Sequence, residues 1–386
     1  MREAFVVGVG MVPVRRRGAE TVRELGRDAV RAAIDDAGVL APTALFVGNM
    51  LAGSLCHQRQ LGALIADAVG LRGIEASVAE AACASGAAAM RSAVLAVASG
   101  AHDVVVAAGV ERMTHIAGDE VTKGLATASD WDSEGGKGET FLSLNARLTR
   151  EYLARHGLSE DALAPFALNA HDNASRAAHA LYRTPITLED YRASRVVAEP
   201  VRLYDVSPIC DGAAAVVVCS REALATLQGA PRVAVSASTV ATDSVGLDGR
   251  RDRLVLDAAV ASTRRAYELA RIGPEDVDFF ELHDAYGVMA ALALEAAGFA
   301  APGRGHVLAA EGEIRPRGRV PVATMGGLKA RGHPVGATGI YQIAEAYLQL
   351  VGRAGDCQLE GPEVALTQSF GGTAATVYTH VLARVG

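Results

Sequence analysis

Residues 325–339 read MGGLKARGHPVGATG. The stretch holds five glycines and one proline in fifteen residues, just before a predicted helix over residues 339–351. This composition indicates an irregular backbone that comes close to another group. His333, in its middle, could act as a general base or pair with a thiolate, while the alternative is a glycine-rich turn with a solvated histidine. No strand precedes the glycines in GxGxxG spacing, so a dinucleotide-binding loop is a poor fit.

A second stretch, residues 81–86 (AACASG), places Cys83 before a predicted helix over residues 84–99 and after a strand-like run at residues 77–79. A cysteine at a helix N-terminus feels the positive end of the helix dipole, which lowers the pKa of the thiol and favours the thiolate. Small neighbouring residues leave room for an acyl group at the sulfur. The alternative interpretation is a small buried cysteine in an alanine-rich helix.

Two more stretches follow predicted strands. Residues 281–286 read ELHDAY, and polar side chains at the carboxyl end of a strand are well placed to face a crevice of an α/β sheet. His283 could donate a hydrogen bond to a developing oxyanion, with Asp284 orienting the backbone or the ring. Residues 369–373 read SFGGT, and their glycine amides could point at a ligand oxygen.

Composition excludes several classes of protein. The 386 residues include 37 Lys and Arg against 44 Asp and Glu, giving a net charge of −7, which argues against nucleic acids or anionic membranes as main partners. Half of the residues are apolar, enough to bury a full core. Two long uncharged stretches, residues 37–58 and 364–383, are interrupted by glycines and polar residues, so we expect no membrane-spanning helix.

The cysteines are five in number, scattered, and without a CxxC pair, so the sequence indicates neither a disulfide framework nor a metal site. The first residues show no signal-peptide pattern. We therefore expect a cytoplasmic protein. The basic triplet at residues 15–17 is interpreted as a solvated loop.

Short Val- and Ala-rich runs alternate with helical patterns, which indicates an α/β fold with strands buried on both faces. The helical pattern of residues 23–38 resembles that of residues 256–273, which suggests an internal duplication. Between about residues 113 and 205 the pattern stops, and this polar insertion is a natural place for a substrate-covering region. Strands are predicted at residues 4–8, 44–47, 103–109, 213–219, 232–239, 277–281, 364–367 and 374–382.

Together and in this order, the motifs resemble those of the thiolase superfamily. Its pattern combines a nucleophilic cysteine in ACASG, an NEAF or HDxF segment, a GGxxxxGHPxGA[ST]G segment and a glycine-rich C-terminal turn. With HDAY in place of NEAF, the chain resembles the sterol-carrier-protein-type and archaeal thiolases. The matching positions here are Cys83 and residues 283–286, 326–339 and 371–372, with further matches at 109–113 (GVERM) and 210–215 (CDGAAA).

The resemblance implies a thiolase fold, in which two similar βαβαβαββ halves, each with a five-stranded sheet, pack in five layers. The N-terminal half would comprise residues 1–112 and 206–230. A loop domain over the coenzyme A site would comprise residues 113–205, and the C-terminal half residues 231–386.

The resemblance also implies roles for individual residues. Cys83 would be acylated by an acyl-CoA, and His333 would take its proton and help to stabilise the thioester oxygen. His283 would hold the oxygen of the second acyl group. The amides of Cys83 and of the Gly371–Gly372 turn would form the other oxyanion pocket.

One position departs from the family pattern. Most thiolases have a second cysteine in a C-terminal CxG turn, but residues 367–372 contain none, and Ala285 stands where sterol-carrier-type enzymes can supply it. Cys357 lies in a predicted loop and is an unsuitable replacement. Proton transfer would then involve Tyr286, or His283 acting as both acid and base.

The implied activity is acyl transfer through a Cys83 thioester, as in thiolysis of 3-ketoacyl-CoA or the reverse Claisen condensation. The substrate would be a coenzyme A thioester, with no permanently bound cofactor, and His171 and Asn173 could touch it. Three alternatives stay open: a ketoacyl-synthase-like enzyme, a retro-aldolase working with a small zinc-ribbon/OB-fold companion, and a non-enzymatic lipid carrier. A homodimer or homotetramer is expected, and the companion protein is a further option for the thiolase itself.

Overall fold

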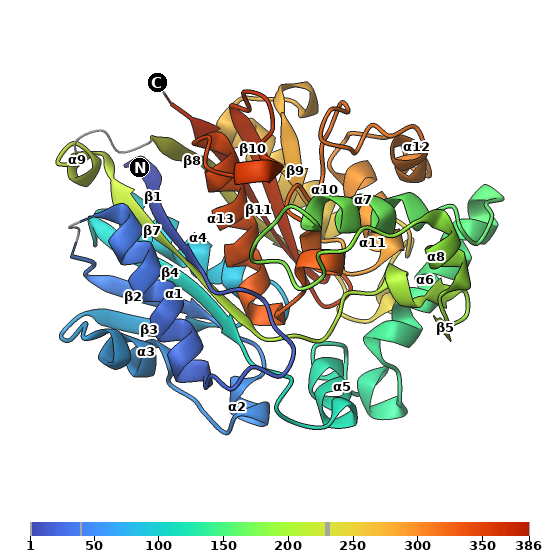
Figure 1. The fold of residues 1–386 in the computed structure, drawn as a ribbon, viewed down its shortest axis with the longest axis horizontal. Coiled ribbons are helices and arrows are strands. Elements are labelled where there is room, and N and C mark those ends of the chain that lie inside the picture. The colour runs from blue at the N-terminus through green and yellow to red at the C-terminus, as the bar shows by residue number, and fades with distance from the viewer. Residues whose placement is uncertain (1, 39–40, 228–231, 386) are drawn as a thin grey trace.

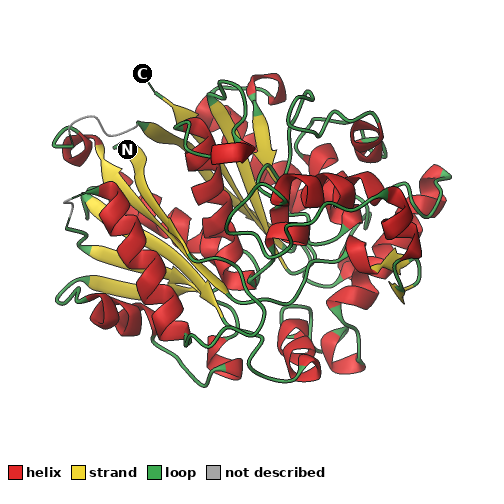
Figure 2. Ribbon diagram, viewed as in Figure 1, coloured by secondary structure: helices red, strands yellow, loops and turns green. Residues whose placement is uncertain are grey.

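The computed structural model describes residues 2–38, 41–227 and 232–385, and its nine main strands form two groups (Figures 1 and 2). In the N-terminal half the sheet order is β3-β2-β4-β7-β1, and in the C-terminal half it is β8-β11-β10-β9. Among the described residues, the strands of the two groups pair only where Phe5 and Val6 of β1 meet β8. The strands are β1 (Ala4–Met11), β2 (Ala44–Gly48), β3 (Glu75–Ala79), β4 (Val104–Glu111), β7 (Gly212–Ser220), β8 (Val233–Thr242), β9 (Phe279–Glu281), β10 (Val364–Gly371) and β11 (Thr376–Arg384).

The thiolase fold is confirmed, with one local difference in the C-terminal half. A fifth strand there is reduced to a single parallel bridge between Phe280 and Val322. Pro321, directly before Val322, accepts a hydrogen bond from the Phe280 amide but has no N–H to donate. The ladder therefore does not continue along this edge.

Helices separate and cover the two groups of strands, giving the five layers. On the outer face of the N-terminal half lie α1 (Val22–Ala37) and α3 (Leu61–Val69). Helices α4 (Ser85–Ser99) and α13 (Thr338–Leu350) fill the middle layer and contact both groups. On the outer face of the C-terminal half lie α10 (Asp257–Ala270) and α11 (Gly287–Ala296).

The internal duplication is visible in the first helix of each half. Helix α1 packs on β1, and α10 packs on β8, so each covers the outer face of the first strand of its half. Thr21 and Glu24 cap the start of α1 through reciprocal hydrogen bonds, and Gly38, with φ of +86°, ends it.

The middle layer is held by direct contact between backbones. A β-carbon at Gly86, in the first turn of α4, would lie 2.9 Å from the carbonyl oxygen of Gly336. A β-carbon at Gly339, in the first turn of α13, would lie 2.4 Å from the amide nitrogen of Ala87. Side chains larger than hydrogen are excluded at both glycines, and the N-termini of α4 and α13 therefore touch.

The segment between β4 and β7 forms its own group of helices, most of it drawn in green in Figure 1. Its helix α6 packs on α11 through Leu144, Leu148 and Tyr152. The boundaries at residues 113 and 205 stay a prediction. The segment contains α5 (Gly118–Ala126), α6 (Phe141–His156), α7 (Ala164–Ala174), α8 (Leu188–Ala193), β5 (Val196–Ala198) and β6 (Val201–Arg202); short helices elsewhere are α2 (Ala52–Leu55), α9 (Arg221–Leu224) and α12 (Gly305–Ala310).

One stretch, Ala82–Ser99, is long and apolar enough to cross a membrane, by length and composition alone. Of this stretch, 56% is buried inside the protein, where α4 lies between the two groups of strands. Its apolar character is that of a core helix.

We predict that Gly339→Ala lowers the free energy of unfolding by about 1–3 kcal/mol, because the added methyl group would push apart α4 and α13. Urea unfolding measures the change. Gly118→Ala is the matched control, since a β-carbon at Gly118 meets no atom within 4 Å. Equal unfolding free energies for the two variants would contradict the contact.

Candidate active site

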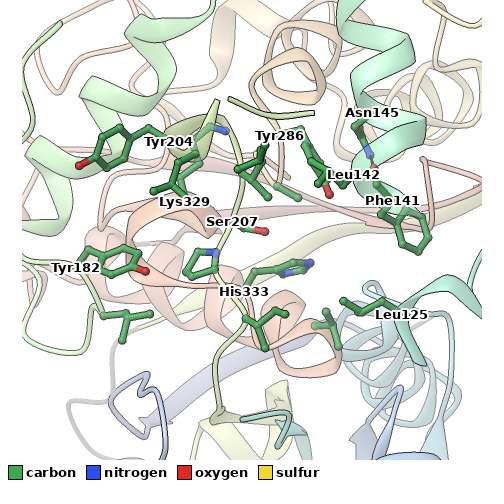
Figure 3. Close-up of a pocket in the computed structure, with 18 of the residues that line it drawn as sticks. Leu125, Phe141, Leu142, Asn145, Tyr182, Tyr204, Ser207, Tyr286, Lys329 and His333 are labelled. Atoms are coloured by element: carbon green, nitrogen blue, oxygen red, sulfur yellow. Dashed lines mark hydrogen bonds between the residues drawn. The ribbon is translucent and has the colours of Figure 1, made fainter. Parts of the chain in front are cut away.

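The three residues expected to carry the chemistry line one cavity. Cys83, His283 and His333 lie around a cavity of about 1040 Å³, together with Tyr286 (Figure 3). Cys83 and His333 come from loops in front of the two middle-layer helices, and His283 follows β9. The touching N-termini of α4 and α13 therefore bring together residues 250 positions apart in the sequence.

The turn that carries Cys83 is tightly constrained. Ala82, directly before it, has a φ of +51°, which is uncommon for a residue with a β-carbon. The hydroxyl of Ser85 accepts a hydrogen bond from the Ala81 amide (2.9 Å) and donates one to the Ala82 carbonyl (2.6 Å). This clamp fixes the backbone on both sides of the cysteine.

The prediction of a Cys83 thiolate is wrong for the substrate-free protein. Burial, and secondly the nearby carboxylate of Glu111, raises the pKa of the Cys83 thiol to about 12. The helix N-terminus was the only influence visible in the sequence, but the sulfur lies in an apolar cluster with Leu51, Met113 and Val335. Loss of hydration at the sulfur outweighs the helix dipole.

His333 is held at both its backbone and its ring. Its N–H donates a hydrogen bond to the sulfur of Cys210 (3.1 Å), and its Nδ1 lies 2.7 Å from Oγ1 of Thr338, the first residue of α13. Gly332, just before it, has a φ of +114°, and a β-carbon there would lie 3.1 Å from the Cys210 sulfur. The residue before the histidine must therefore be glycine.

The ring of His283 has a defined tautomer. Its Nδ1 accepts a hydrogen bond from the Phe370 amide at 3.3 Å, so the neutral ring carries its proton on Nε2. The rings of His283 and His333 lie 5.1 Å apart between centroids, at 89° to each other. Burial lowers the pKa of His283 to about 3 and that of His333 well below its ordinary value. Both imidazoles are therefore uncharged.

The neighbours of His283 have separate tasks. Asp284 orients backbone rather than a ring, because its Oδ1 accepts a hydrogen bond from the Leu328 amide at 2.7 Å. Tyr286 lines the cavity, and its hydroxyl forms no hydrogen bond within the described residues. Burial, and then the proximity of Cys83, raises the pKa of Tyr286, so its phenol stays protonated and can donate.

The C-terminal turn contributes one of its two glycines to the cavity. Gly372 lines it, whereas Gly371 is not among the lining residues. Gly371 ends β10, paired with Thr376, and a β-carbon there would lie 2.5 Å from the Ala81 carbonyl oxygen. Gly371 thus packs the turn against the Cys83 loop instead of facing the cavity.

Of the two residues expected to touch coenzyme A, only His171 lines the cavity. Its ring stacks on Tyr182 with 5.8 Å between centroids and meets the edge of Tyr204 at 5.3 Å. Asn173 does not line it, and its amide donates to the carbonyls of Val322 and Ala323. Because His171 and Asn173 are two positions apart on α7, their side chains point in nearly opposite directions.

Sequence reasoning missed a buried carboxylate that organises the site. Glu111, at the end of β4, accepts hydrogen bonds from the Met50 and Gly336 amides and from the Asn49 side chain, at 3.0, 3.1 and 3.0 Å. Burial raises the pKa of Glu111 to about 7 against the opposing effect of these donors. The sequence did offer one signal for this carboxylate, because Glu111 lies within residues 109–113 (GVERM), which match the thiolase pattern.

A buried cation lies close to both imidazoles. Arg331 is fully buried, with its Nε 3.4 Å from Glu345 and its guanidinium above the Tyr341 ring. After burial itself, the positive charge of Arg331 is a further cause of the lowered pKa values of His283 and His333. No sequence signal separated this arginine from a solvated one.

Exposed arginines surround one end of the cavity. Arg16, Arg183 and Arg195 line it, and none of them has an acidic partner within the described residues. Arg16 also lies 5.9 Å from the ring centre of Tyr182. Residues 15–17 are exposed, as expected for a solvated loop, but Arg16 in addition lines the cavity. Among the described residues, no group of three or more His, Cys, Asp or Glu side chains is placed to hold a metal ion.

Comparison with known proteins covers almost the entire chain. The model of the thiolase N-terminal domain matches residues 4–222, and that of the thiolase C-terminal domain-like family matches residues 239–384. The chain is 42% identical to an acetyl-CoA acetyltransferase of Methanothermobacter thermautotrophicus, over 100% of both chains. It is 32% identical to the benzoylsuccinyl-CoA thiolase subunit BbsB of Thauera aromatica, over 96% of this chain and 95% of that one.

A solved structure agrees in fold. The Ltp2-ChsH2(DUF35) aldolase superposes with a TM-score of 0.84 over 99% of this chain and 98% of that one, at 23% identity. That likeness concerns the fold alone. On the evidence of both domain models and of full-length relatives, the chain belongs to the thiolase family, as a thiolase-type acyltransferase.

Proposed function

We propose that the enzyme takes an acyl group from coenzyme A onto the sulfur of Cys83 and then exchanges it in a Claisen condensation or its thiolytic reverse. The observation that carries this proposal is the convergence of Cys83, His283 and His333 on one cavity. The presence of the cysteine there favours acyl transfer over the retro-aldolase and lipid-carrier alternatives.

The acylation step begins from uncharged groups. As the sulfur of Cys83 attacks the thioester carbonyl, its proton passes to Nε2 of His333. This transfer requires the tautomer with its proton on Nδ1, which then donates to Oγ1 of Thr338, 2.7 Å away. The Nε2–H of His283 is free to donate to an oxygen that becomes negative in the cavity. When the carbon–sulfur bond to coenzyme A breaks, His333 returns the proton to the departing thiol. Each oxyanion donor of this kind typically contributes about 10²–10³ in rate.

The second step needs a base for the α-proton and a donor for the enolate oxygen. The Nε2 of His283 already carries a proton and its Nδ1 is engaged by the Phe370 amide, which leaves this ring no lone pair for the α-proton. His333 is neutral again after acylation and can accept it. The unpaired phenol of Tyr286 then supplies a hydrogen bond to the enolate oxygen.

The arginine-lined end of the cavity fits the nucleotide of coenzyme A. Arg16, Arg183 and Arg195, which have no acidic partner among the described residues, provide positive charges for its phosphate groups. The rings of Tyr182 and Tyr204 offer flat surfaces for its adenine at the same end. The substrate would thus be a coenzyme A thioester, with no permanently bound group.

We also propose that the enzyme is cytoplasmic, because free thiols such as its five cysteines stay reduced in that compartment. Two of its surfaces suggest protein partners. Strand β3 pairs with β2 on one edge only, and its Val78 is 43% exposed, which supports a homodimer formed along this edge. Near the arginine-lined end, Val196 and Leu203 are 43% and 44% exposed, a surface suited to a small companion protein.

The direct test is intact-protein mass spectrometry after mixing with acetyl-CoA. We predict that the wild type gains one acetyl group and that Cys83→Ala gains none, because that sulfur carries the acyl group. Cys357→Ala, which removes another buried cysteine, should be acetylated like the wild type. Acetylation that survives Cys83→Ala, or its absence from the wild type with every acyl-CoA, would refute the proposal.

For the second step, we predict that Tyr286→Phe slows hydrogen–deuterium exchange at the α-carbon of bound acetyl-CoA by about 10²-fold, as expected for one lost oxyanion donor. Acetylation of Cys83 in the same variant serves as the internal control and should persist. Exchange at the wild-type rate would eliminate the tyrosine from this step.

A further inference from the structure

The cavity has two chemically different ends on opposite sides of His333. In Figure 3, Tyr182, Tyr204 and Lys329 lie to one side of His333, while Phe141 and Leu142 lie to the other. The first end carries the exposed arginines described above. The second end has no Lys or Arg side chain among its described lining residues.

Apolar side chains from two helices line most of this second end, which we call the apolar arm. Leu125 comes from α5, and Phe141 and Leu142 come from the first turn of α6, with Asn145 of the same helix beside them. Leu125, Phe141 and Leu142 are half-buried and line the cavity. The apolar arm therefore presents hydrocarbon surface to the cavity.

The walls of the apolar arm are held in place by the rest of the molecule. Thr140 and Ser143 cap the start of α6 through reciprocal hydrogen bonds, which fixes the turn carrying Phe141 and Leu142. The carboxylate of Glu134, just before α6, accepts a hydrogen bond from the Leu247 amide of the C-terminal half at 2.7 Å. These contacts hold the first turn of α6 and the segment before it against the rest of the molecule.

We propose that the apolar arm holds the hydrocarbon tail of the acyl group on Cys83, and that the enzyme prefers acyl groups several carbons longer than acetyl. This inference rests on the proposed function. With the phosphates of coenzyme A at the arginine-lined end, the acyl chain leaves the sulfur toward the other end. There it meets apolar side chains. Each methylene group buried against them should raise the binding constant by about fourfold.

The experiment compares the rates at which Cys83 is acylated by acetyl-, butanoyl- and hexanoyl-CoA, followed by intact-protein mass spectrometry. In the wild type we expect kcat/KM for hexanoyl-CoA to exceed that for acetyl-CoA by about tenfold or more. Leu142→Asn and, independently, Leu125→Asn should each reduce this ratio at least threefold. Leu269→Asn, which alters an exposed leucine of α10, is the matched control and should keep the wild-type ratio.

The possible failures are distinguishable. Acetylation of Cys83 without a preference for the longer chains, or a preference that both apolar-arm variants retain, would overturn this inference while the proposed function stands. A wild type that forms no adduct with any of the three thioesters would overturn both.

Discussion

The contact between the N-termini of α4 and α13 is the constraint on which the rest of the site depends. Gly86 and Gly339 let the two backbones meet without intervening side chains. Because Cys83 lies two residues before α4 and His333 five residues before α13, this contact determines that the sulfur and the imidazole share a cavity. The two halves of the duplicated fold each contribute one of these helices, so neither half contains a complete site.

The site is built to be uncharged before substrate arrives. Burial raises the pKa of the Cys83 thiol and lowers that of both imidazoles, and the buried charges of Glu111 and Arg331 act in the same directions. A thiol that shares a cavity with two neutral imidazoles binds the ground state without strong electrostatic interactions. Charge develops only as the proton moves and the carbonyl oxygen becomes negative, when the donors around the cavity gain strength. This arrangement favours the transition state over the bound thioester.

Much of the fold could be predicted from the sequence, and α1 and the duplicated strand–helix order are the clearest cases, because hydrophobic periodicity and capping residues are local signals. The site was predictable as a set of motifs, but not in its electrostatics. The raised pKa of Cys83 depends on burial by residues distant in sequence. Likewise, a run of arginines does not reveal that Arg16 faces a cavity, and only the helical geometry of α7 separates Asn173 from its neighbour His171.

The central claim, a site that holds a thiol rather than a thiolate, is tested most directly by the rate at which iodoacetamide alkylates Cys83 between pH 7 and pH 10, read from the peptide that contains it. Only the thiolate reacts, and burial raises the pKa of this thiol to about 12. The rate should therefore climb about tenfold with each pH unit and reach no plateau in this range. A rate already at its plateau near neutral pH would mean that a thiolate–imidazolium pair exists before substrate binds, and would contradict the account.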